Sequence, residues 1–231
     1  MVIDVGGSGL KAMLLDSKGH PVSERERIPT PAIPTPRACL IGFDKLKAAL
    51  PKFDRVSIGF PGVVKRGAVW TAVNLHPAWE GFPLQQQLEK RWHKPVRVAN
   101  DAVIQGYGAI KGVGLEMVLT LGTGMGNTLF TFGRAYPLEL GHHPWKRHTY
   151  EDYIGRRGLD KYGKKRWNKF LFEVIKQTAA TFNWDHLYLG GGNTKKIDFE
   201  LPKDVSIVSN ETGLLGGVAL WRDETLSGKR R

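Results

Sequence analysis

The sequence predicts an α/β fold, in which strands and helices alternate and pack in layers. Short apolar runs rich in Val, Ile and Leu recur between segments whose apolar residues follow helical spacing. Two pairs of these runs are joined by glycine-rich turns, at Gly6–Gly9 and Gly122–Gly126, so each pair is typical of a hairpin. A long segment, 167–182, carries one apolar stripe. At 231 residues the chain is long enough for one large domain or two small ones around a cleft.

The first half opens with the hairpin. Its strands are the apolar runs Val2–Val5 and Ala12–Leu15. The segment Ile28–Pro36 (IPTPAIPTP) is a proline-rich connector, since proline lacks the N–H that a central strand needs and also breaks helices. The elements expected after it are a helix over 40–50, a strand over 56–60, a strand over 96–99 and a helix that begins at 102.

The second half repeats this opening. The runs Met117–Leu121 and Thr128–Phe132 flank the glycines of 122–126. The stripe in the helix over 167–182 predicts core packing and no binding site. The remaining elements expected are a strand over 186–189 that leads into Gly190–Gly192, a strand over 205–208 and a terminal helix from Thr212 to about Asp223.

The composition is that of an ordinary globular protein, with 41% hydrophobic and 24% charged residues. No apolar run approaches the roughly 20 residues that span a bilayer. The first strand-like run begins at Val2, which leaves no room for a signal peptide ahead of it. A single cysteine, Cys39, excludes an internal disulfide framework and a cysteine-based zinc site. We therefore expect a cytoplasmic protein.

The net charge is unusual. Lys and Arg number 34 against 22 Asp and Glu, which gives a formal charge of +12. A field of this sign favours polyanions such as nucleic acid, an anionic membrane or a highly charged substrate, although the same charge can simply keep a protein soluble. Between His142 and Lys176, ten basic residues face four acidic ones, so this segment carries half of the surplus. Its basic residues are either a solvated helix face or an extended track for an anionic chain.

Three glycine-rich turns follow strands. Glycine permits positive φ and lets the backbone approach a ligand, so successive N–H groups can surround phosphate oxygens. None of the turns fits a Walker pattern or a dinucleotide fingerprint that opens a helix. One such turn usually only reverses the chain, but three, two of them in matching hairpins, favour phosphate binding. The turns are Gly6-Gly7-Ser8-Gly9, Gly122-Thr123-Gly124-Met125-Gly126 and Gly190-Gly191-Gly192-Asn193.

Two acidic positions could carry chemistry. Asp4 lies in the first strand just ahead of its turn, and it either holds Mg²⁺ or its waters beside phosphates or pairs with Lys11 across the hairpin. Asn100-Asp101 ends the strand over 96–99. Such a pair is commonly a helix N-cap, but a carboxylate there can also take the proton of an attacking hydroxyl.

A second group of residues has sugar-binding chemistry. Glu139 and His142 offer a carboxylate and an imidazole at three-residue spacing, and Asn74 and Trp79 could hydrogen-bond to a sugar ring and pack on it. Each of these residues alone is more often structural.

Taken in order, these segments resemble the ROK (repressor, ORF, kinase) family of bacterial sugar kinases, within the actin and hexokinase superfamily. The resemblance covers most of the chain. Asp4–Lys11 resembles the first phosphate motif, with Ser8 where Thr is usual, and Asn100–Ala102 the motif that holds the catalytic aspartate. The other similar segments are Gly59–Val64 with Asn74-Leu75 (leading to sugar contacts), Leu121–Gly126 (second phosphate motif), Glu139–His142 (E-x-G-H sugar motif) and Leu189–Asn193 (against the nucleoside).

The resemblance implies a two-domain actin/hexokinase-like (ribonuclease H-like) fold, with mixed sheets facing across a cleft. The small domain would be 1–108 plus 213–231, and the large domain 109–212. Asp101 would draw the proton from the 6-hydroxyl of glucose or a related hexose. The sugar would be bound by Asn74, Asn100, Asp101, Glu139, His142 and Glu151. Donor phosphates or nucleotide would be bound by Asp4, Gly6, Gly7, Ser8, Gly9, Lys11, Thr123, Gly124, Gly126, Gly191, Gly192 and Asn193, with Mg²⁺ carried on the phosphates.

The sequence also departs from the family pattern. Many members bind zinc through the histidine of E-x-G-H and three cysteines, but no cysteine follows Cys39, so we expect no zinc. This and the short connection to Glu139 resemble the polyphosphate glucokinase branch, which uses inorganic polyphosphate and often ATP. The expected partners are glucose and these donors, with a homodimer as the assembly and neither nucleic acid nor a membrane. Two rival functions remain open: a nucleic-acid-associated regulator, favoured by the charge, and a catalytically silent sugar sensor.

Overall fold

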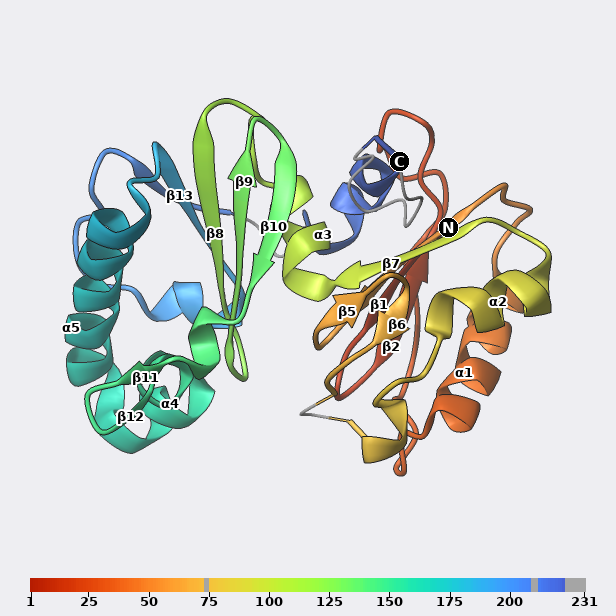
Figure 1. The fold of residues 1–231 in the computed structure, drawn as a ribbon, viewed down its shortest axis with the longest axis horizontal. Helices are drawn as coiled ribbons and strands as arrows, with labels where there is room; N and C mark the ends of the chain where they lie inside the picture. The colour runs from red at the N-terminus through yellow and green to blue at the C-terminus, as the bar shows by residue number, and fades with distance from the viewer. Residues whose placement is uncertain (73–74, 209–211, 223–231) are drawn as a thin grey trace. The chain divides into compact units, whose positions relative to one another are not determined.

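The structure, a computed structural model, describes residues 1–72, 75–208 and 212–222. Its internal contacts divide the chain into two compact units, Met1–Gly108 with Gly213–Arg231 (unit 1) and Ala109–Thr212 (unit 2). Each unit is built on its own five-stranded sheet with helices packed on it (Figure 1). The predicted α/β class with mixed sheets is therefore confirmed.

The sheet of unit 1 combines antiparallel and parallel pairing. The first three strands of the spatial order pair antiparallel with one another, the fourth pairs in parallel with the third, and the fifth pairs in parallel with the fourth. The expected hairpin is present, but its second strand starts at Leu10, because Val5 pairs with Leu10 and leaves only Gly6–Gly9 in the turn. In spatial order the strands are β3 (Glu26–Ile28), β2 (Leu10–Met13), β1 (Val2–Val5), β4 (Val56–Phe60) and β7 (Val96–Asn100).

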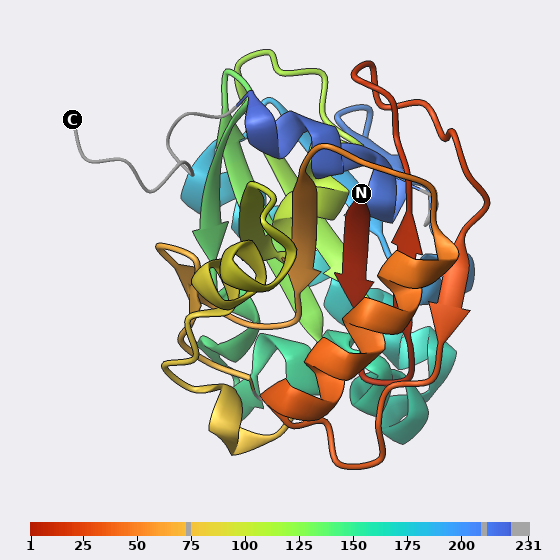
Figure 2. The same cartoon turned by 90° about the vertical axis from the view of Figure 1, so that its right-hand side faces the viewer.

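Helices cover both faces of this sheet. On one face lies α1 (Pro36–Ala49), where Gly42 packs against Leu10; Figure 2 shows α1 crossing in front of β1. The helix begins after the proline-rich connector because Thr35 Oγ1 accepts the Ala38 N–H at 3.3 Å. The opposite face carries α3 (Asp101–Tyr107) and the 3-10 helix η4 (Gly216–Trp221). The remaining elements are α2 (Leu84–Trp92), η1 (Pro77–Trp79) and the small hairpin β5 (Val64–Lys65) with β6 (Ala68–Val69).

The core of unit 1 contains Trp79, so of the two alternatives for this residue the structural one holds and packing on a sugar is excluded. Trp79 is fully buried, its ring centroid lies 4.9 Å from that of Phe60, and its Nε1 donates to the Pro34 carbonyl at 2.7 Å. A ring enclosed on all sides cannot stack on a ligand. Trp79 instead fixes the proline-rich connector to the core.

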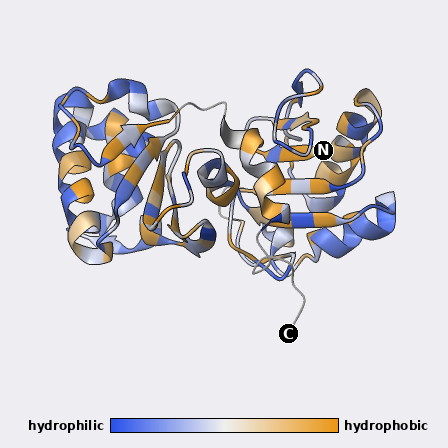
Figure 3. Cartoon of the chain, turned by 90° about the horizontal axis from the view of Figure 1, so that it is seen from above, coloured by the Kyte–Doolittle hydropathy of each residue, from blue (hydrophilic) through white to orange (hydrophobic). Residues whose placement is uncertain are grey.

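The sheet of unit 2 has the same pattern of antiparallel and parallel strand pairs as the sheet of unit 1. The first three strands of the spatial order pair antiparallel, the fourth pairs in parallel with the third, and the fifth pairs in parallel with the fourth. In spatial order they are β10 (Arg134–Leu138), β9 (Met125–Thr131), β8 (Leu115–Leu121), β13 (His186–Gly190) and β14 (Val205–Ile207). Hydrophobic residues lie on the central strands of both sheets (Figure 3), and β4 and β8 are almost wholly buried, as strands covered on both faces are.

The long helix of unit 2, α5 (Arg156–Phe182), starts earlier than the expected 167–182 because the chain bends at Gly163 (φ 73°, ψ 160°) and two helical segments join there. Trp167, Leu171 and Val174 are fully buried, so the stripe is core, as predicted. Shorter elements surround it: η2 (Leu140–His142), β11 (Pro144–Trp145), β12 (His148–Thr149), α4 (Tyr150–Ile154) and η3 (Gly192–Lys196).

The expected terminal helix is α-helical only over α6 (Thr212–Leu215) and continues as η4, while Asp223 lies outside the described residues. Close packing accompanies this change: a Cβ on Gly216 would collide with the Ile104 carbonyl, and one on Gly217 with Val2. Among the described helices, none is long and apolar enough to cross a membrane.

Candidate functional site

The first glycine turn is fixed by hydrogen bonds to its own unit, and its tip is exposed to solvent. The Gly6 N–H donates to the Gly9 carbonyl at 3.1 Å, and Thr30 Oγ1 donates to the Gly6 carbonyl at 2.5 Å. Gly7 and Ser8 are exposed, and nothing lies within 4 Å of a Cβ placed on Gly7. A cavity of about 550 Å³ adjoins it, lined by Gly7, Thr30–Pro34 and Leu75–Pro77. The turn therefore presents backbone to a space that a ligand can enter.

Asp4 and Lys11 form the ion pair that was one of the two alternatives for Asp4. Lys11 Nζ donates to Asp4 Oδ2 at 2.8 Å, and both side chains are partly exposed. The two residues are register partners on β1 and β2, so their side chains lie on the same face of the sheet. This pair neutralises Asp4 yet leaves it at the surface beside the turn.

Asn100 and Asp101 share the start of α3. Asn100 is the N-cap: its Oδ1 accepts the Ala102 N–H at 2.8 Å, and its Nδ2 donates to the Gly62 carbonyl at 3.0 Å. Asp101 Oδ1 accepts the same Ala102 N–H at 2.8 Å. Asp101 lies over Gly59, whose added Cβ would sit 3.5 Å from the Asp101 Cα. Because Gly59 pairs with Asp4, Asp101 lies on the face that carries Asp4 and Lys11.

Asn74, the other sugar ligand expected in this unit, lies outside the described residues. Arg27, which no sequence motif singled out, lies against the first turn: its Nη2 is 3.4 Å from the Ser8 carbonyl. The signal that could have found it is the alternation of β3, which places Arg27 opposite Lys11.

The second glycine turn is shorter than expected. Met125 and Gly126 belong to β9, where they pair with Leu121 and Thr120, so only residues 122–124 form the turn. Gly126 continues the strand because its backbone N–H and C=O groups can be satisfied by pairing with the neighbouring antiparallel strand. The Gly122 N–H donates to the Gly124 carbonyl at 3.2 Å, which closes the turn.

Two other segments pack against this turn. The third glycine segment approaches it from β13: Asn193 Nδ2 donates to the Gly122 carbonyl at 2.8 Å, and Gly191, at φ 92°, contacts the Leu121 backbone. The junction of α4 and α5 also contacts it, because the Arg156 N–H donates to the Gly122 and Thr123 carbonyls at 3.0 and 3.1 Å. The second and third phosphate motifs are therefore neighbours at one end of the sheet.

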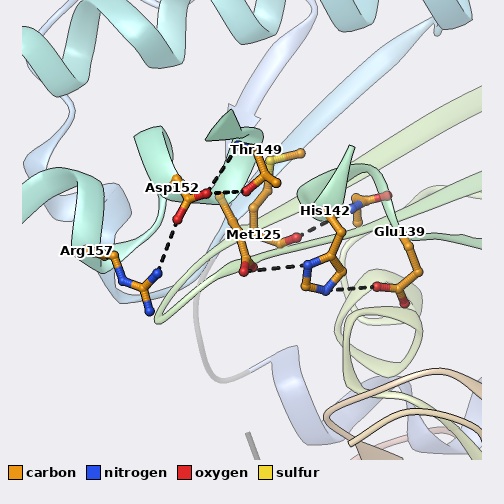
Figure 4. A network of polar contacts seen from close by, with 8 residues as sticks. Met125, Glu139, His142, Thr149, Asp152 and Arg157 are labelled. Atoms are coloured by element: carbon orange, nitrogen blue, oxygen red, sulfur yellow. Dashed lines mark hydrogen bonds and ion pairs between the residues drawn. The ribbon is translucent and has the colours of Figure 1, made fainter. Parts of the chain in front are cut away.

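The candidate sugar ligands of unit 2, Glu139, His142 and Glu151, form one network of polar contacts (Figure 4). His142 Nε2 lies 3.5 Å from Glu139 Oε2, and His142 Nδ1 lies 3.6 Å from Glu151 Oε1. Glu151 also contacts Gly124 of the second turn. Glu151, which the resemblance assigned to the sugar, thus lies beside the E-x-G-H residues. α4 positions it, starting with a capping box between Thr149 and Asp152.

The network affects the pKa of Glu139. Burial raises the pKa of this carboxyl above its usual range, attraction to His142 lowers it, and repulsion from Glu151 raises it further. A partly buried carboxylate with one imidazole neighbour can accept hydrogen bonds from ring hydroxyls. Among the described residues, no group of three or more His, Cys, Asp and Glu has an arrangement that could hold a metal ion.

The ten basic residues between His142 and Lys176 are all exposed. Four of its ten cations form ion pairs: Lys146 with Glu173, Arg156 with Asp160, Arg157 with Asp152 and Lys164 with Asp198. The other six take part in no ion pair with a described residue: Arg147, Lys161, Lys165, Arg166, Lys169 and Lys176. The positive charge is therefore only partly neutralised within unit 2.

The chain is similar to known proteins in both sequence and structure. The model of the ROK family matches residues 1–158. Polyphosphate glucokinase of Mycobacterium tuberculosis (strain H37Rv) is 31% identical over 224 residues, covering 91% of this chain and 82% of that protein. The Mycobacterium leprae polyphosphate glucokinase is 29% identical over 87% of this chain, and the match spans 65% of that protein.

Solved structures give the same picture. The inorganic polyphosphate/ATP-glucomannokinase from Arthrobacter sp. strain KM has a TM-score of 0.82 at 28% identity, covering 94% of this chain and 95% of that one. A ROK family glucokinase from Streptomyces griseus, in complex with glucose and AMPPNP, has a TM-score of 0.74 at 22% identity, covering 94% and 97%. These likenesses confirm the expected actin/hexokinase-like fold.

Proposed function

Because the chain belongs to the ROK family, we propose that it is a sugar kinase that phosphorylates the 6-hydroxyl of glucose, with inorganic polyphosphate, ATP or both as donor. The observation that carries the proposal is the place of Asp101. It follows a parallel strand, at the start of a helix, on the sheet face that bears Asp4, Lys11 and the first glycine turn. Relatives named polyphosphate glucokinase and glucomannokinase support the choice of sugar and donor.

In this proposal Asp101 is the general base. It accepts the proton of the sugar hydroxyl as the oxygen attacks the terminal donor phosphate. Asn100 holds Asp101 in place, because its side chain bonds both the first turn of α3 and the Gly62 carbonyl. Each unit would be one domain, a small one of 1–108 plus 213–231 and a large one of 109–212.

The proposed sugar ligands are Asn74 and Asn100 with the network of Glu139, His142 and Glu151. Glu139 and Glu151 accept hydrogen bonds from ring hydroxyls, and His142, between them, orients both carboxylates. His142 can donate from either ring nitrogen when protonated, so this one residue couples the two acceptors.

Donor phosphates would be held by the glycine turns. Backbone N–H groups of Gly6–Gly9 with Lys11, and of residues 123–126 with the segment 191–193, are the ligands that the proposal assigns. Asp4, which is partly exposed beside the turn, would supply an oxygen to Mg²⁺ together with the donor phosphates, and the ion would neutralise charge on the transferred group. The partly unpaired cations of 146–176 would guide an extended polyphosphate chain, which carries charge along its length.

A coupled assay of glucose 6-phosphate formation tests the proposal directly. Glucose and mannose are each offered with Mg²⁺ and either ATP or polyphosphate, and turnover with at least one pair is expected. Sugar binding by calorimetry without turnover from any donor would instead identify a catalytically silent sugar sensor. Absence of both sugar binding and turnover would refute the proposed function.

A further inference from the structure

Arg27 extends the row of charged residues on the functional face of unit 1. It is the register partner of Lys11, which is in turn the partner of Asp4, across β3, β2 and β1. Paired residues of neighbouring strands point to the same face, so these three side chains and Asp101 share one face of the sheet. With about 4.8 Å between strands, Arg27 lies roughly 10 Å from Asp4 along the row.

The guanidinium of Arg27 lies directly against the first glycine turn. A Cβ on Gly9 would sit 2.8 Å from Arg27 Nε and 3.1 Å from Nη2, so Gly9 leaves room for this side chain. Nη2 also points at the Ser8 carbonyl at 3.4 Å, a long hydrogen bond. Arg27 thus lies beside the turn whose outer side, at Gly7 and Ser8, is exposed.

The positive charge of Arg27 is not neutralised by an ion pair with any described residue. The residue is exposed, and among the described residues no carboxylate lies within ion-pair distance of it, whereas Asp4 is paired with Lys11. A guanidinium has five N–H donors in a rigid fork, and only one contacts the turn. A group that merely covered Gly9 would need no charge.

We propose that Arg27 is a ligand of the donor phosphates, binding those that stay on the donor. The inference rests on the proposed function and adds to it a cation that lies outside the glycine motif. An arginine fork binds phosphate oxygens in a bidentate manner, which a lysine cannot do. Since Arg27 lies two strands beyond Asp4, on the side away from Gly59 and Asp101, it contacts phosphates remote from the transferred one. Its loss therefore affects donor binding more than the chemical step.

The test compares three variants with the wild-type chain. Arg27→Gln removes the charge, Arg27→Lys keeps the charge without the fork, and Arg134→Gln is the matched control, an exposed arginine on β10, the edge strand of the unit 2 sheet. For each, kcat and KM are measured for donor and for glucose. The dissociation constant for inorganic tripolyphosphate with Mg²⁺ is measured by calorimetry.

Arg27→Gln is expected to raise the donor KM and the tripolyphosphate Kd by about ten- to a hundred-fold, with the glucose KM unchanged. Arg27→Lys should restore part of this loss, and Arg134→Gln should stay within about two-fold. A lowered kcat with unchanged donor KM and tripolyphosphate Kd would show that Arg27 only supports the turn, and would overturn the proposal. If Arg27→Gln does not fold, unchanged values in a folded Arg27→Lys decide against it equally.

Failure of the proposed function gives a different result. In that case the wild-type chain phosphorylates no hexose, but its tripolyphosphate affinity still tests Arg27. Turnover in the wild type with no difference between Arg27→Gln and Arg134→Gln would overturn the inference alone.

Discussion

Replacing Asp101 by Asn separates catalysis from helix capping. Asn100 and Asp101 both accept the Ala102 N–H at 2.8 Å, so the cap survives when Asp101 loses its charge. The structural cost is then the loss of a carboxylate from the first turn of α3, about 0.3–1 kcal/mol. Loss of a general base lowers kcat by roughly 10²–10⁴-fold, or about 2.7–5.4 kcal/mol in the barrier. The chemical effect therefore exceeds the structural one several-fold.

The measurement pairs the coupled glucose 6-phosphate assay with thermal unfolding. Asp101→Asn should nearly abolish turnover while glucose binding and Tm change little. Asn100→Ala is the control, since it removes one of the two acceptors of the Ala102 N–H together with the bond to the Gly62 carbonyl, and it should lower Tm by several degrees. Near wild-type turnover in Asp101→Asn would refute the role of base and leave Asp101 a helix-start residue.

Four further predictions concern unit 2 and the metal. Glu139→Ala should weaken glucose binding by about ten- to a hundred-fold in calorimetry, with Glu200→Ala, an exposed glutamate, as control; equal affinities would exclude Glu139 as a sugar ligand. The raised pKa of Glu139 means that the native state holds this proton more tightly than the unfolded chain, so its stabilising contribution is lost as the pH rises through the folded value. Glu139→Gln should therefore raise Tm relative to wild type at neutral pH but not below about pH 4, and a lower Tm at neutral pH would contradict this. The double variant Lys165→Gln/Lys169→Gln should raise KM for long-chain polyphosphate more than for ATP, and should make the polyphosphate KM rise less steeply with added KCl. The control Lys18→Gln/Lys45→Gln, at two exposed lysines of unit 1, should do neither. Identical salt slopes for both donors would show that the basic residues of 146–176 do not bind polyphosphate. Elemental analysis should find no stoichiometric zinc, and one zinc per chain would contradict the interpretation of the missing cysteines.

Much of the local structure at the candidate site could be predicted because its motifs are local. The turn Gly6–Gly9 and the helix start at Asn100 depend on residues adjacent in sequence, and both lie at the ends of predicted strands. The predictions that were wrong involve contacts between distant segments. Trp79 was a candidate for packing on a sugar ring, but Pro34 and Phe60 enclose it. Met125 and Gly126 were expected in a turn, but pairing with β8 makes them strand.

The sequence by itself determined the α/β alternation, the repeated hairpin, the buried stripe of α5 and the family, because periodicity and short glycine motifs are properties of neighbouring residues. Only the tertiary structure decided that Glu151 meets His142 and that Asn193 bonds the Gly122 carbonyl. It also decided that Arg27 rests on Gly9. The register between strands and the packing of α4 set these contacts, and register is fixed by which faces the whole unit buries. No local window of sequence contains that information.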